Sequence, residues 1–182
     1  MADLTTLPRV KEWLAITAST SDALLSRLIS AASDYIETYL SRNIARTSYQ
    51  SYRDGHGGRR LMFRNYPVAS LTAVKVGGVS IPPSVNGSPG FVHTETSVTL
   101  VGGYVFESGA SNVYLEYVAG YDPIPNEIEQ ACIDLVSMRY RERDRIGLTS
   151  KSLAGESITF NTREFSDAVG STLVQYKRVA LP

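Results

Sequence analysis

Apolar residues recur at helical spacing in the first quarter of the chain. Leu7 to Ala15 predicts a short helix, with Pro8 in its first turn and Val10, Trp13 and Leu14 on one side. Asp22 to Ser41 predicts a longer helix, because a wide apolar stripe lies opposite a polar face. The stripe consists of Leu24, Leu25, Leu28, Ile29, Ala32, Ile36, Tyr39 and Leu40.

The helical period is lost after Ile44, and the composition shifts toward Gly, Ser, Tyr and Val. Alternating apolar and polar residues here predict β-strands. Gly77-Gly78 predicts a tight hairpin turn, whereas Pro82 to Gly90 predicts a loop. The expected strands are Ser48 to Arg53, Arg60 to Arg64, Leu71 to Val76, Val79 to Ile81, Ser97 to Val101 and Asn112 to Val118.

Helical spacing returns at Ile124, after a turn from Gly120 to Pro125. A second long helix is expected from here to about Gly147, with Ile128, Ala131, Cys132, Leu135 and Met138 on its apolar side. Leu148 to Thr162 is rich in Ser and Gly, with one β-like run from Ser157 to Phe160. A last helix from Ser166 or Asp167 is short, so it must pack on its own domain or on a neighbour.

The order of these elements predicts an α+β fold. Its helical frame has a short N-terminal helix, two long helices and a short C-terminal helix, and a β-rich insertion lies between the long helices. The expected segments are 1–45 (N-terminal helices of the helical core), 46–118 (β-rich insertion), 119–147 (long helix completing that core) and 148–182 (flexible tail with the short C-terminal helix).

Charge and composition narrow the possible partners. The 182 residues contain 18 basic and 18 acidic side chains, so the formal net charge is zero, unlike a protein whose main partner is a polyanion. Any contact with DNA must therefore be confined to a small part of the protein surface. The N-terminus has no signal-peptide pattern and no apolar run is long enough to span a bilayer, so we expect a soluble, unexported chain without a membrane partner.

Residues that could carry chemistry are few. The single cysteine, Cys132, excludes an internal disulfide and lies on an apolar helix stripe, and His56 and His93 are far away in sequence. Negative charge at Glu127 and Glu129, like that at Asp122, suits the first turn of a helix better than a metal site. We therefore expect no metal and no cofactor.

Two further sequence motifs could indicate an enzyme. Gly55-His56-Gly57-Gly58 followed by Arg59-Arg60 resembles a phosphate loop, but the Gly-Lys-Ser or Gly-Lys-Thr ending is absent, which favours a hairpin loop. No Gly-x-Ser-x-Gly elbow is present. We predict that the chain is not an enzyme, and a small hydrolase with a site in the β region ranks last among the alternatives.

The end of the second long helix is rich in arginine. Arg139, Arg141, Arg143 and Arg145 alternate with acidic Glu142 and Asp144. Complementarity to the helix dipole and local ion pairs account for part of this pattern. A protein interface or a rim facing DNA is the other interpretation. The alternative function is accordingly a small nucleic-acid-binding module that uses these arginines together with Arg59-Arg60.

Several short motifs follow one another along the helical frame and tail. They are Leu7-Pro8-x-Val10-Lys11-x-Trp13-Leu14, Ala32-x-x-Tyr35-Ile36-x-x-Tyr39-Leu40, Leu115-x-Tyr117-x-Ala119-Gly120-Tyr121-x-x-Ile124-Pro125, Glu127-Ile128-x-x-Ala131, Tyr140-x-x-Arg143, Leu153-Ala154-Gly155-Glu156-Ser157 and Tyr176-Lys177-Arg178. In this order they resemble the head-tail connector, or adaptor, family of tailed bacteriophages. The region from Arg46 to Gly109 matches mainly by position, and shorter members of that family are nearly all helix.

The resemblance implies a non-enzymatic virion protein. Its copies would form a homo-oligomeric ring, commonly twelvefold, under the portal protein, extend the DNA channel and receive the next neck or tail-completion protein. DNA would pass through without sequence-specific binding. The protein would reside at the head-tail junction of the virion, and in the host cytoplasm during assembly. The expected interface residues are Arg139, Arg141, Arg143, Arg145, Leu153, Phe160, Leu173, Tyr176 and Arg178.

Overall fold

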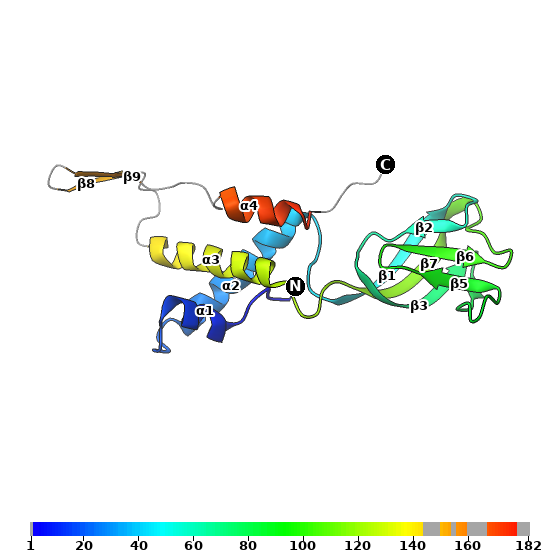
Figure 1. Ribbon diagram of the computed structural model, residues 1–182, viewed down its shortest axis with the longest axis horizontal. Coiled ribbons are helices and arrows are strands. Elements are labelled where there is room, and N and C mark those ends of the chain that lie inside the picture. The colour runs from blue at the N-terminus through cyan, green and yellow to red at the C-terminus, as the bar shows by residue number, and fades with distance from the viewer. Residues whose placement is uncertain (1, 144–149, 154–155, 160–166, 178–182) are drawn as a thin grey trace. The chain divides into compact units, whose positions relative to one another are not determined.

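The computed structural model describes residues 2–143, 150–153, 156–159 and 167–177 (Figure 1). It consists of helices and antiparallel sheets, so the α+β class predicted from the sequence is confirmed. The chain divides into two compact units. The first, called the helical unit here, contains Met1–Arg42 and Ile124–Pro182, and the second, called the strand unit, contains Asn43–Pro123.

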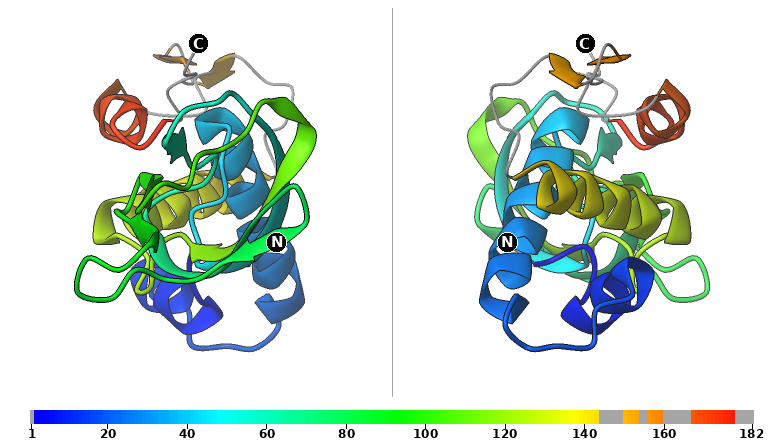
Figure 2. Two further views of the ribbon diagram at one scale, coloured as in Figure 1. Left: turned by 90° about the vertical axis from the view of Figure 1, so that its right-hand side faces the viewer. Right: turned by 90° about the vertical axis from the view of Figure 1, so that its left-hand side faces the viewer.

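Four helices build the described part of the helical unit. They are α1 (Leu7–Leu14), α2 (Asp22–Leu40), α3 (Asn126–Glu142) and α4 (Asp167–Val174). α3 contacts the other three, and α1 also contacts α2 (Figure 2). Two short strands, β8 (Ser150–Leu153) and β9 (Glu156–Thr159), pair with each other in antiparallel register. The predicted end of the second long helix at Gly147 lies outside the described residues.

The core of the helical unit comes from the apolar stripes of α2 and α3, joined by Val10 of α1 and Leu173 of α4. The buried residues of the two long helices include Leu25, Ile29, Ala32, Ile36, Leu40, Ile128, Ala131, Cys132 and Leu135. The residues predicted to share one side of α1 differ in burial, since Val10 is fully buried whereas Trp13 is 55% exposed. A helix of only two turns buries Val10 completely and leaves the large indole at the rim of the contact with α3.

Two sheets form the strand unit. The larger has the order β1 (Thr47–Gly55), β7 (Gly109–Ala119), β3 (Val68–Val76) and β4 (Val79–Ile81). The smaller has the order β2 (Arg60–Met62), β6 (Ser97–Val101) and β5 (Gly90–His93). One apolar cluster includes residues of both sheets, among them Leu115 and Tyr117 of β7 and Val98 and Leu100 of β6. The Tyr117 ring stacks on Tyr49 at 5.5 Å and meets Phe63 at 4.8 Å between ring centroids.

Some predicted features of this region are confirmed and others are wrong. The turn at Gly77-Gly78 joins β3 to β4, and both glycines have the positive φ that such a turn needs, +56° and +84°. The loop from Gly55 to Gly58 does not close a hairpin, because β1 pairs with β7 and β2 pairs with β6. β5 was not predicted, since its four residues follow directly on a loop rich in Pro, Ser and Gly.

Burial raises the pKa of the Cys132 thiol from 9.0 to about 11, although a contact with the Ser33 hydroxyl at 3.7 Å opposes the shift. The prediction that Cys132 is a small buried residue is confirmed. Above pH 9 the unfolded chain releases the thiol proton while the folded chain keeps it, so ionisation favours unfolding. The stability contributed by the buried thiol is therefore lost as pH rises toward about 11.

We expect Cys132→Ala to abolish the loss of folding stability that the buried thiol causes at high pH. Between pH 9 and pH 11 the unfolding free energy of the wild type should fall relative to the variant, by as much as about 1.4 kcal/mol per pH unit. Urea denaturation at several pH values measures both curves. Curves that stay parallel across this range would contradict the assignment.

Gly120 follows β7 at a point where the backbone leaves no room for a side chain. Its φ is +111°, and a Cβ here would lie 2.6 Å from the carbonyl oxygen of Ala45. The Gly120 N–H donates to the carbonyl of Pro67 at 2.9 Å, so the strand end cannot simply move away. Gly103 has a similar φ of +95°, but its Cβ would meet nothing within 4 Å.

We expect both Gly120→Ala and Gly103→Ala to destabilise the strand unit through backbone strain of about 1–3 kcal/mol. Gly120→Ala should cost more, by at least about 1 kcal/mol, because it adds the clash with Ala45. Denaturant unfolding of both variants gives the difference. Equal losses would show that the close approach at Ala45 does not constrain the turn.

Candidate assembly interface

The segment before α1 is fixed to both long helices. The Leu4 N–H donates to the Ser33 hydroxyl of α2 at 2.9 Å. Glu129 of α3 has a buried side chain that accepts a hydrogen bond from the Thr5 hydroxyl at 3.2 Å and forms an ion pair with Arg9. Because a buried carboxylate needs such partners, Glu129 holds the N-terminal segment in place.

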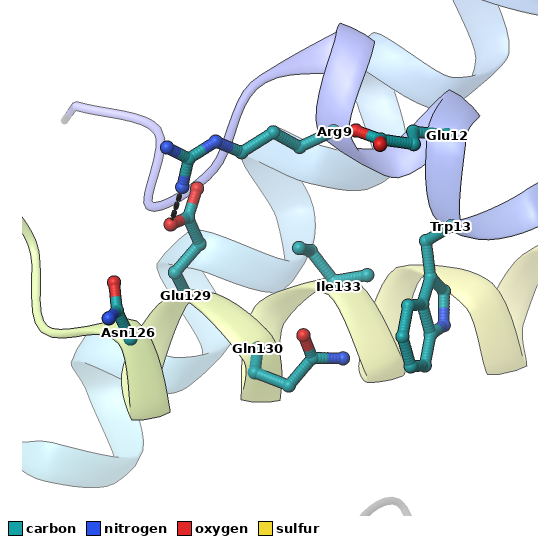
Figure 3. A pocket seen from close by; sticks show the side chains of 7 residues that line it. All are labelled: Arg9, Glu12, Trp13, Asn126, Glu129, Gln130 and Ile133. Carbon is teal, nitrogen blue, oxygen red and sulfur yellow. Dashed lines mark hydrogen bonds and ion pairs between the residues drawn. The ribbon is translucent and has the colours of Figure 1, made fainter.

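A groove of about 450 Å³ lies between α1 and α3 (Figure 3). We call it the Trp13 groove. In Figure 3 the indole stands beside α3 toward one end, and the pair formed by Arg9 and Glu129 lies at the other. An exposed tryptophan next to a groove is typical of residues that contribute much of the binding energy at protein interfaces. The groove is lined by Arg9, Glu12, Trp13, Asn126, Glu129, Gln130 and Ile133.

A second groove of about 450 Å³ lies between α3 and α4. We call it the α3–α4 groove. Val169 supplies apolar surface, and Glu127 and Asp134 supply carboxylates. No Lys or Arg is among the residues that line this groove. The Gln130 amide donates to Asp134 at 2.9 Å. The groove is lined by Asn126, Glu127, Gln130, Ala131, Asp134, Val169 and Thr172, so it shares Asn126 and Gln130 with the Trp13 groove.

α4 is docked on its own chain. Leu173 is fully buried, and the Tyr176 hydroxyl donates to Glu127 of α3 at 2.9 Å. Arg42 donates to the Tyr176 carbonyl at 3.5 Å, and the Lys177 ammonium lies 5.2 Å from the ring centre of Tyr39. These contacts place two of the expected interface residues, Leu173 and Tyr176, against the helical unit.

The arginine-rich end of α3 is partly held by aromatic rings. The Arg139 guanidinium lies 5.2 Å from the ring centre of Tyr35, and that of Arg143 lies 4.3 Å from the ring centre of Tyr140. Arg141 is exposed and makes no ion pair with any residue that the structure describes. The Arg143 guanidinium also donates to the Tyr140 carbonyl at 3.2 Å. Arg139 and Arg143 are thus held against their own chain, and Arg141 is an exposed donor beside them.

The structure does not describe the side chains of the other four expected interface residues. Arg145, Phe160 and Arg178 lie outside the described residues, and Leu153 belongs to β8, where the structure describes the strand but not the side chain. The structure therefore separates the expected set into two groups. Arg139, Arg141 and Arg143 lie at the C-terminal end of α3, whereas Leu173 is buried on α4 and Tyr176 donates to Glu127 in the first turn of α3.

The motifs considered for chemistry do not form a site. The Gly57 N–H donates to the Phe106 carbonyl at 2.7 Å and the Phe106 N–H to the Gly58 carbonyl at 2.8 Å, so hydrogen bonds within the strand unit occupy this loop. Cys132 is buried in the helical unit, whereas His56 and His93 are exposed on the strand unit. Among the described residues no three His, Cys, Asp or Glu side chains gather as metal ligands would.

The model of the head completion protein family matches residues 3–179. The chain belongs to this family. Its membership confirms the resemblance to head-tail connector proteins predicted from the short motifs. Within the part of the chain that the structure describes, no helix combines the length and apolar character needed to cross a bilayer.

Solved structures of phage-like particles share the fold. A chain in the neck of an empty gene transfer agent (GTA) particle, computed with C6 symmetry, is 18% identical, with a TM-score of 0.59. A chain of the native GTA virion is 14% identical with a TM-score of 0.60, and one from the native neck, computed with C12 symmetry, is 16% identical with a TM-score of 0.58. Each alignment covers 97% of this chain and 90% of the other. No curated protein sequence matches.

Neither groove was predicted from the sequence. The spacing of Glu127, Gln130 and Asp134 shows that they share one face of α3. Only the position of α4 makes that face one wall of a groove. Similarly, the helical spacing of α1 placed Trp13 on one side with Val10 and Leu14, and the exposure of the indole follows from how α1 meets α3.

We expect Leu173→Ala to release α4, because an eight-residue helix is marginal without its buried anchor and the deletion of a buried leucine costs about 2–5 kcal/mol. Hydrogen exchange of the amides of α4 should become fast while α2 and α3 stay protected. Val174→Ala is the matched control, since the Val174 side chain is 54% exposed. Unchanged protection in Leu173→Ala would contradict this account of docking.

Proposed function

We propose that this protein is a head-tail connector, a non-enzymatic structural component that forms a ring beneath the portal of a phage-like virion. The ring would extend the DNA channel and receive the next neck or tail-completion protein. The observation that carries the proposal is the family match over residues 3–179. The fold shared with neck proteins of GTA particles, two of them computed with C6 or C12 symmetry, supports an assembly of repeated copies.

The surface of the helical unit suits such an assembly. The Trp13 groove and the α3–α4 groove share Asn126 and Gln130 of α3, and the arginine-rich end of that helix adds a third surface. A ring needs two different surfaces on each copy, because a head-to-tail contact joins unlike patches. The net charge of zero suits a channel through which DNA passes without being bound tightly.

Sedimentation across a range of concentrations, alone and with purified portal, tests the proposal. We expect the wild-type protein to form complexes much larger than a monomer, at least when portal is present. Trp13→Ala should weaken the assembly by about tenfold or more, because exposed tryptophans at interfaces often contribute 2 kcal/mol or more. Tyr52→Ala removes another exposed aromatic side chain, on the strand unit, and is the control.

Persistent monomers that ignore the portal would count against the connector function. The alternative, a nucleic-acid-binding module using the arginines of α3, predicts DNA binding that weakens steeply with salt. A wild type that binds DNA in this way and does not assemble would favour the module. Absence of DNA binding at low salt would rule out the nucleic-acid-binding module.

A further inference from the structure

One face of α3 carries opposite charges at its two ends. Glu127, Asp134 and Arg141 are spaced by seven residues, which is about two helical turns, so they lie along the same side of the helix. The first two line the α3–α4 groove, and Arg141 is exposed near the end of the helix. The spacing of seven positions from Asp134 to Arg141 corresponds to about 10 Å of helix, so these two side chains are not neighbours within a copy.

The α3–α4 groove has the chemistry that an arginine side chain needs. Val169, which is partly exposed, can cover the apolar stem, while Asp134 and Glu127 offer carboxylate oxygens to the guanidinium. The side chains that line the groove include acids, amides and a hydroxyl but no cation, so nothing there repels a positive charge. The groove and Arg141 are therefore complementary in charge, yet they face different ends of one helix.

We propose that Arg141 of one copy inserts into the α3–α4 groove of the next copy, where it pairs with Asp134 and Glu127. This inference rests on the connector function proposed above and names the contact that joins the copies. The contact joins unlike surfaces, so it leaves each pair with one unused groove and one unused arginine. Repetition adds further copies and can close into a ring.

We choose Arg141 of another copy as the residue that fills the groove because its charge is complementary and because a ring needs a contact that can repeat from copy to copy. A two-fold contact would use the groove and the arginine of both copies at once, and growth would stop at a dimer. Arg139 and Arg143 are held over the rings of Tyr35 and Tyr140, which leaves Arg141 as the arginine exposed on the same face as the groove.

Charge reversal tests the contact. Asp134→Lys and Arg141→Glu should each weaken assembly of the full-length chain by about tenfold or more, because each places like charges in the contact. The double variant Asp134→Lys with Arg141→Glu should recover most of the assembly, and so should an equal mixture of the two single variants. Glu95→Lys is the control, since it makes the same charge change at an exposed acid of the strand unit, outside both grooves.

Mass photometry or analytical ultracentrifugation, with and without portal, measures the size of the complexes, and circular dichroism verifies that each variant is folded. Recovery in complexes larger than a dimer supports the proposal. Recovery that stops at a dimer overturns the head-to-tail arrangement. If neither the double variant nor the mixture of single variants recovers assembly, the pairing of these residues is wrong.

The remaining outcomes separate this inference from the connector function. If the wild type and both single variants assemble equally well, the contact is wrong and the connector function stands. If Asp134→Lys loses portal binding but keeps its self-association, the groove serves the portal, and the contact between copies is again wrong. If the wild type neither self-associates nor binds portal, the connector function and the contact both fail.

Discussion

The packing of α2 against α3 is the constraint on which the helical unit depends. The two helices are separated in sequence by the whole strand unit, and each is apolar on one side only. Burying both stripes against each other closes the core and brings Ser33 of α2 next to Cys132 of α3. The N-terminal segment then gains its two fixed points, Ser33 for Leu4 and Glu129 for Thr5 and Arg9.

α3 has a different role on each of its sides. Its apolar side packs in the core, while its exposed side, around Asn126 and Gln130, separates two grooves whose other walls come from α1 and α4. Both neighbouring helices are short, with eight residues each, so each covers α3 only in part. Incomplete cover explains why polar and apolar groups remain accessible beside a helix whose core side is closed, and such surfaces suit a protein that functions by assembly.

Several elements could be read directly from residue patterns, because their signals are local. The stripe of α2, the two-glycine turn between β3 and β4, and the change of period that leads into α3 each depend on neighbours in sequence. The interpretation of Gly55 to Gly58 as a hairpin loop was wrong because strand pairing is not local. β7 provides hydrogen bonds to both β1 and β3, so β2 pairs elsewhere, with β6.

The sequence by itself determined which segments are helical, where the strands are concentrated, that Cys132 is buried, and that the chain resembles a connector. These features depend on periodicity and short motifs, which neighbouring residues encode. Only the tertiary structure decided that Trp13 lies exposed beside a groove, that Leu173 is buried, and that Glu127 and Asp134 line the α3–α4 groove. Exposure and grooves depend on how distant helices meet, and a helical pattern defines the apolar side of a helix but not the extent to which its partner covers that side.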